Sequence, residues 1–115
     1  MSNTTDEPRV YGLDEPRYLE EWFSLTGCEH HIIVELAKAE STEAYVTGAM
    51  LVERTGRPTS TVYDALGDLA EQGLISKEPL TGATDHYSLT DVGGGTLHSG
   101  AVELKSVIEK LEKSE

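Results

Sequence analysis

One stretch of the chain, residues 47–75, restricts the fold more than any other. It reads T-G-A-M-L-V-E-R-T-G-R-P-T-S-T-V-Y-D-A-L-G-D-L-A-E-Q-G-L-I. The G-R-P at 56–58 divides it into two segments, because glycine favours the end of a helix and proline prevents its continuation. We expect a short helix capped by Thr47 before this break, and a longer helix capped by Thr59 or Ser60 after it.

The longer helix is expected to bury one side only. Its apolar residues recur at positions i, i+3, i+4 and i+7, which are Val62, Ala65, Leu66 and Leu69. This spacing makes one apolar stripe and leaves the small and polar side chains of the same segment facing outward. Two helices joined by a few residues, with the second striped in this way, are typical of a helix-turn-helix.

A β-hairpin is expected directly after Gly73, which ends the longer helix. Residues 74–78 alternate apolar and polar side chains, and residues 86–89 form a second strand-like run. The T-G-A-T-D at 81–85 has the composition of a turn between them. Such a hairpin would be the wing of a winged helix.

Helical patterns also lie on the N-terminal side of this unit. The T-G-C-E at 26–29 has the form of a capping box and predicts the start of a helix. Before it, from residue 14 onward, apolar residues recur at helical spacing. These are Leu19, Trp22, Phe23 and Leu25.

The last helix is expected to carry a seam for self-association. Its apolar residues step by 4, 3, 4 and 3, which is a heptad pattern about two heptads long. They are Leu97, Ala101, Leu104, Ile108 and Leu111. We expect this seam to pair with a second copy, the alternative being packing within one chain. Leu19, Trp22 and Phe23 are expected in the core or in the same dimer interface, the alternative for Trp22 and Phe23 being an exposed platform for a ligand. The G-G-G at 93–95 is interpreted as a flexible joint.

These elements predict a mainly α-helical fold with a small β-hairpin wing, a winged helix-turn-helix whose terminal helices form a dimer interface. Within the 115 residues we expect a mobile arm at 1–10, the winged helix-turn-helix domain at 11–92 and a dimerisation helix at 93–115.

Two motifs carry a family resemblance. The S-T-V-Y-D-A-L-G-D-L-A-E-Q-G-L-I at 60–75, followed by the Y-S-L-T-D-V-G at 87–93, resembles the PadR-like winged-helix transcription regulators. MarR-like and ArsR-like repressors share parts of the pattern. With the acidic composition, the chain is similar to haloarchaeal PadR-like regulators of the oxidative-stress response. The resemblance implies a homodimer that is assembled through terminal helices and binds pseudo-palindromic promoter DNA. No enzymatic activity is expected, because the sequence contains no catalytic constellation.

The charge of the chain conflicts with this resemblance. The formal net charge is −12, from 21 acidic and 9 basic residues, whereas DNA-binding surfaces are usually basic. Either the protein binds no polyanion, or it works in a cytoplasm so salty that carboxylates serve as solubility groups. We favour the second explanation, because at about 1 M salt the Debye length is only about 3 Å. Bridging K⁺ or Na⁺ ions would then link carboxylates such as Asp64 and Glu71 to DNA phosphates.

The expected DNA-binding residues fall into three groups. Arg54 and Arg57 would contact phosphates, unless they are ordinary surface arginines. The outward face of the longer helix offers Thr59, Ser60, Thr61, Tyr63, Asp64 and Gly67, unless it is only a solvated face. The wing offers Lys77, Thr81, Thr84 and His86, unless its strands only cover the core.

Other functions find less support in the sequence. The C-E-H-H at 28–31 is the one metal-like cluster, and without a matching distant pair it is too weak to predict a metal site. Cys28 is expected to be a buried or bystander thiol rather than a redox sensor. No catalytic motif, secretory signal or membrane-length apolar run is present, so a cytoplasmic protein is expected. The alternative function is a winged-helix module that binds a partner protein instead of DNA.

Overall fold

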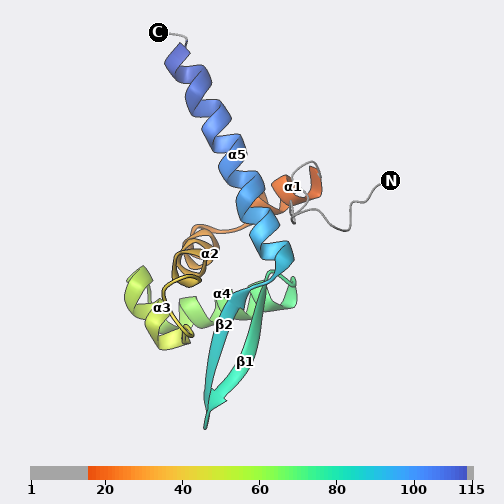
Figure 1. Cartoon of the computed structure of the whole chain (residues 1–115). Helices are drawn as coiled ribbons and strands as arrows, with labels where there is room; N and C mark the ends of the chain where they lie inside the picture. Colours follow the sequence, from red (N-terminus) through yellow and green to blue (C-terminus); the bar gives the residue numbers. More distant parts are fainter. Residues whose placement is uncertain (1–15, 114–115) are drawn as a thin grey trace, which may run out of the picture.

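A helix-turn-helix lies at the centre of the molecule, with a hairpin on one side and a long helix leading away from it (Figure 1). The computed structural model describes residues 16–113, so the arm expected at 1–10 lies outside the described residues. The elements follow the order α1 (Pro16–Ser24), α2 (Gly27–Ala39), α3 (Gly48–Thr55), α4 (Thr59–Glu71), β1 (Ile75–Thr81), β2 (Thr84–Leu89) and α5 (Asp91–Lys113). Within residues 16–113, no helix is both long enough and apolar enough to cross a bilayer.

The core forms where α2, α3 and α4 meet the base of the hairpin. All four stripe residues of α4 are buried, and Val62 and Leu69 have no exposed surface. They pack in one cluster with Ile32 and Ile33 of α2 and with Leu51 of α3. This packing confirms the predicted helix-turn-helix. Because the apolar stripe of α4 is buried, the opposite side of the helix faces solvent.

Two of the three predicted helix caps are confirmed. The Thr26 hydroxyl accepts the Glu29 N–H at 3.2 Å, while a Glu29 carboxylate oxygen accepts the Thr26 N–H at 2.8 Å, which completes the capping box. At α3, the Thr47 hydroxyl accepts the Met50 N–H at 3.3 Å. Gly56, with φ of 68°, ends α3 in the left-handed region that glycine adopts at least cost.

The predicted cap of α4 is wrong. Pro58, with φ of −58° and ψ of 146°, is the N-cap, and no side chain caps this helix. The proline ring fixes φ of Pro58 and favours the extended backbone that precedes a helix, so the helical backbone begins at Thr59. Thr59 and Ser60 consequently lie inside the first turn, and their hydroxyls are not used as caps.

The hairpin confirms the predicted wing. Its strands are antiparallel, with Ile75 opposite Leu89 at the base and Thr81 opposite Thr84 at the tip. Both strands extend further toward the tip than expected, because the turn is tight and Gly82 supplies its positive φ of 56°. An isolated bridge between Thr47 and His86 joins the hairpin to the segment before α3.

The interpretation of residues 93–95 as a flexible joint is wrong, because they belong to the first turns of α5. The Thr90 hydroxyl accepts the Gly93 N–H at 3.0 Å and so caps the helix. A side chain at Gly93 would meet the backbone carbonyl of Leu74. Glycine is needed here for a close approach of α5 to the chain entering the hairpin, and not for flexibility.

Only the first half of α5 belongs to the packed body. The buried residues of α5 all lie within 93–100, and α5 contacts α1, whereas the C-terminal part of the helix projects away from the other elements (Figure 1). Trp22 of α1 is buried and stacks on His30, with ring centroids 3.9 Å apart. Trp22 is therefore a core residue of a single chain, one of the two locations expected for it, and Leu19 on the same helix is half-buried.

Candidate nucleic-acid interface

The outward face of α4 is exposed. It includes all six residues predicted from the helix, namely Thr59, Ser60, Thr61, Tyr63, Asp64 and Gly67. The first turn contains no acidic residue and no side-chain cap. Its leading N–H groups and three hydroxyls are consequently available to an acceptor such as a phosphate oxygen.

Two hollows border this face on the side of the wing. One lies between α4 and β1 and is lined by Tyr63, Leu66, Gly67, Ala70, Glu71, Lys77 and Tyr87. The other lies between the start of α3 and the wing tip and is lined by Thr47, Gly48, Ala49, Tyr63, Ala83, Thr84, Asp85 and Tyr87. Tyr63 and Tyr87 line both, so these two rings lie where α3, α4 and the wing meet.

The two tyrosines differ in exposure. Tyr63 is 44% exposed, whereas Tyr87 is 6% exposed. Burial raises the pKa of the Tyr87 hydroxyl, and the nearby Asp85 and Tyr63 raise it further. Tyr87 therefore stays a neutral phenol that forms the floor of the site, and Tyr63 is the ring that a partner can touch.

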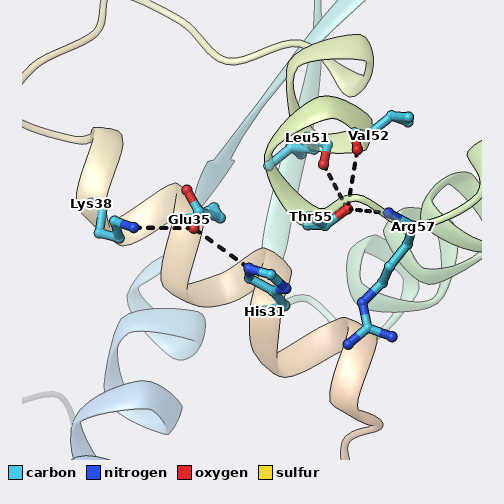
Figure 2. A network of polar contacts seen from close by, with 7 residues as sticks. All are labelled: His31, Glu35, Lys38, Leu51, Val52, Thr55 and Arg57. Atoms are coloured by element: carbon cyan, nitrogen blue, oxygen red, sulfur yellow. Dashed lines mark hydrogen bonds and ion pairs between the residues drawn. The ribbon is translucent and has the colours of Figure 1, made fainter.

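The two predicted arginines are both directed toward other parts of the chain. An Arg54 guanidinium nitrogen lies 2.6 Å from a carboxylate oxygen of Glu43, so its charge is already compensated. Arg57 extends from the turn toward the first turn of α2 (Figure 2), where its Nη2 would be 3.7 Å from a Cβ at Gly27. Its Nε is buried and has no hydrogen-bond partner within residues 16–113. Neither arginine supplies an unpaired charge beside Tyr63.

The predicted wing residues do not all lie on one surface. Lys77 is opposite Tyr87 and lines the hollow beside α4. His86 points to the other face of the hairpin because neighbouring positions along a strand alternate. There its Nε2 lies 3.9 Å from a Glu78 carboxylate oxygen, and its ring meets the ring of Tyr45 edge-on. Thr81 and Thr84 are exposed at the tip.

The balance of charge on α4 is negative, as the sequence indicates. Asp64, Asp68 and Glu71 are all exposed on it. Lys77 is an exposed cation at the edge of the same face, and it forms no ion pair within residues 16–113. An anionic duplex would approach carboxylates here and would need cations from the solvent between them.

The side chains of the cluster at 28–31 do not converge on one point, because each has different neighbours. Glu29 is engaged in the capping box, and His30 Nε2 lies 2.7 Å from the Trp22 carbonyl oxygen. His31 lies 3.6 Å from Glu35, which also binds Lys38 (Figure 2). In the part of the chain that the structure describes, no three potential ligands come together. Cys28 is buried, and burial raises the pKa of its thiol, an effect that Arg57 partly opposes.

The seam of α5 divides into a packed and an exposed part. Leu97 packs against the core, whereas Leu104, Ile108 and Leu111 are 48%, 53% and 64% exposed. Ala101 is exposed as well, and so is Phe23 of α1. Val107 is 43% exposed on the same stripe and was missed because it falls outside a strict heptad. A search for residues at i, i+3, i+4 and i+7 from Leu104 would have found it.

A helix-turn-helix followed by a two-stranded hairpin and a terminal helix defines a winged-helix protein. MepR, described as a transcription regulator of the Staphylococcus aureus multidrug efflux pump MepA, superimposes with a TM-score of 0.74 at 17% identity, over 86% of this chain and 73% of that one. A point mutant of S. aureus MepR bound to an oligodeoxyribonucleotide has a TM-score of 0.69 at 17% identity, over 86% and 71%.

A complex structure of hsRosR-S4 has a TM-score of 0.63 at 23% identity, over 81% of this chain and 79% of that one. At identities this low, the similarity to these structures shows a shared fold only. No protein-family model matches the sequence, and no curated protein matches it at a significant level.

Proposed function

We propose that this protein is a transcription regulator of PadR-like type that binds promoter DNA as a homodimer. The observation that carries the proposal is the face of α4. It is exposed, it presents three hydroxyls and a phenol, and it lies beside a wing. A helix that buries one stripe and leaves such a face open fits the major groove. MepR, which shares this fold, is a transcription regulator and has a mutant structure with a bound oligodeoxyribonucleotide.

Hydroxyl groups would make most of the direct contacts. Ser60 and Thr61 reach phosphate or base edges as donors or acceptors, and Asp64 accepts from a cytosine amino group. The uncapped first turn of α4 adds N–H donors for a phosphate. Gly67 permits a close approach, since nothing lies within 4 Å of the position its Cβ would take. Thr81 and Thr84 would follow the backbone from the wing tip.

Monovalent cations would compensate the acidic face. K⁺ or Na⁺ ions between phosphates and Asp64 or Glu71 replace the lysines and arginines that other DNA-binding proteins use. At molar salt the counterion-release gain of basic side chains has largely gone. Short-range hydrogen bonds and DNA shape then carry specificity, and these are little affected by screening. The resemblance to haloarchaeal oxidative-stress regulators makes a stress-response promoter the favoured target.

The homodimer would form through α5. Leu104, Val107 and Ile108 make an apolar stripe in which each side chain is about half exposed. A second copy of the same stripe would bury it in the manner of a short coiled coil. Two α4 helices would then face two half-sites of a pseudo-palindrome.

Fluorescence anisotropy on the protein's own promoter region, measured from about 0.1 M to about 2 M KCl, tests the proposal. We expect affinity that stays level or increases with KCl, and weaker but still measurable binding by Tyr63→Ala. An unrelated duplex of equal length is the control for specificity. A steep decrease in affinity with salt contradicts the cation bridges while leaving DNA binding intact.

The acidity of α4 favours one other candidate, a module that binds a basic partner protein. In that case the same anisotropy series shows no promoter binding at any KCl concentration. The Asp64, Asp68 and Glu71 carboxylates would then attract lysines of the partner, and high salt would weaken that complex.

A further inference from the structure

Gly48 has no backbone reason to be glycine. The glycines of the described chain with positive φ are Gly56, Gly73 and Gly82, so Gly48 has a conformation open to any residue. It is the first residue of α3, directly after the capping Thr47, and it is buried. Alanine would be the better helix former at such a position. The reason for glycine must therefore come from a contact.

That contact is the ring of Tyr63. A Cβ on Gly48 would collide with the phenol hydroxyl and would lie 2.5 Å from Cζ and 2.7 Å from Cε1. Gly27 is a matched comparison, because it is the first residue of α2 and follows the capping Thr26. A Cβ there would meet only Arg57 Nη2 at 3.7 Å, an ordinary contact.

The Tyr63 ring also lies near Tyr87 of the wing. Tyr63 and Tyr87 line both hollows, and Tyr63 is close enough to raise the pKa of the Tyr87 hydroxyl. The ring thus lies near both the start of α3 and Tyr87 of the wing. Part of it remains accessible, since Tyr63 is 44% exposed.

We propose that Gly48 is a positioning residue for DNA recognition. It leaves the space in which the Tyr63 ring rests, and so it determines where the phenol hydroxyl meets the duplex. A hydrogen bond from a phenol weakens steeply when its direction changes, so a ring displaced by one methyl group loses most of its contact. This inference rests on the proposed function, because it concerns DNA contact by α4.

The test is a double-mutant cycle with Gly48→Ala, Tyr63→Ala and the combined variant, and with Gly27→Ala as the control. Promoter affinity is measured at high KCl, and tyrosine ring resonances of the free proteins are followed by NMR. We expect Gly48→Ala to weaken binding about 2- to 10-fold, the range of one lost hydrogen bond. In the Tyr63→Ala background the same substitution should cost nothing. Tyr63 resonances should shift in Gly48→Ala and stay in place in Gly27→Ala.

The outcomes separate the two proposals. Failure of the wild-type protein to bind any promoter DNA overturns the proposed function. Normal binding by Gly48→Ala, unmoved Tyr63 resonances, or an equal loss with and without Tyr63 overturns the positioning role. Thermal unfolding of Gly48→Ala tests for general damage to the fold. The Tyr63 ring is 44% exposed and can move toward solvent, so we expect the midpoint to equal or exceed that of the wild type. A clear decrease would also count against the positioning role.

Discussion

The indole of Trp22 in α1 lies against the backbone of Gly100 in α5, with no side chain of α5 between them. A Cβ on Gly100 would be 2.6 Å from three ring carbons, Cδ1, Cδ2 and Cε2. The ring cannot easily retreat, because its other contacts include the stacked imidazole of His30. This contact joins the first helix to the last one and holds α5 at the angle from which it projects.

Gly100→Ala should therefore destabilise the fold. Overpacking of this kind costs about 1–3 kcal/mol, more than the roughly 1 kcal/mol that alanine gains over glycine inside a helix. Chemical denaturation followed by circular dichroism measures the difference. Gly67→Ala is the matched control, since nothing lies within 4 Å of its added methyl group. Its free energy of unfolding should increase. Equal effects of the two substitutions would show that the Trp22 contact is unimportant.

Leu104→Glu should dissociate the homodimer that we propose. Leu104 is 48% exposed on the stripe that we assign to dimerisation, and a carboxylate there would be buried without a partner. Val102, 52% exposed, is the matched control, because two positions along a helix point about 200° apart. Sedimentation equilibrium should give a monomer for Leu104→Glu and a dimer for Val102→Glu. A dimer in both cases would place the interface elsewhere.

Glu43→Gln should strengthen the proposed DNA binding at low salt. It releases Arg54, whose guanidinium is now 2.6 Å from the Glu43 carboxylate, and a free arginine near the duplex gains by counterion release. We expect a several-fold increase in affinity at about 0.1 M KCl that disappears near 1 M. Glu53→Gln, an exposed acid on the same helix as Arg54, removes the same charge without releasing an arginine. An equal increase in affinity in both variants would show that only the net charge matters and that the release of Arg54 does not.

The stability of the protein should decrease at alkaline pH partly through Cys28. Burial raises the pKa of this thiol above its unfolded value, so the native state retains the proton to a higher pH. The resulting stabilisation is complete below the pKa of the unfolded thiol, about 8.5, and is lost as the pH increases through the folded value. Free energies of unfolding between about pH 7 and pH 10 should decrease more in the wild type than in Cys28→Ala. Parallel curves would contradict this assignment.

The sequence alone determined the elements that depend on neighbouring residues. The stripe of α4, the capping box at Thr26, the cap at Thr47 and the hairpin turn at Gly82 all follow from local spacing and backbone preference. Such signals extend over a few residues, so a short stretch of sequence contains them completely. The choice between Thr59 and Ser60 as cap failed because the fixed φ of Pro58 outweighed the preference for a hydroxyl.

The tertiary structure decided which residues meet across elements. Glycine at 48, 93 and 100 is explained by a ring or a carbonyl from another element, and a sequence shows no such partner. For the same reason, only the folded chain shows that Glu43 neutralises Arg54 and that Arg57 turns toward α2. Packing density rather than local preference governs these positions, because two segments far apart in the chain must share one volume.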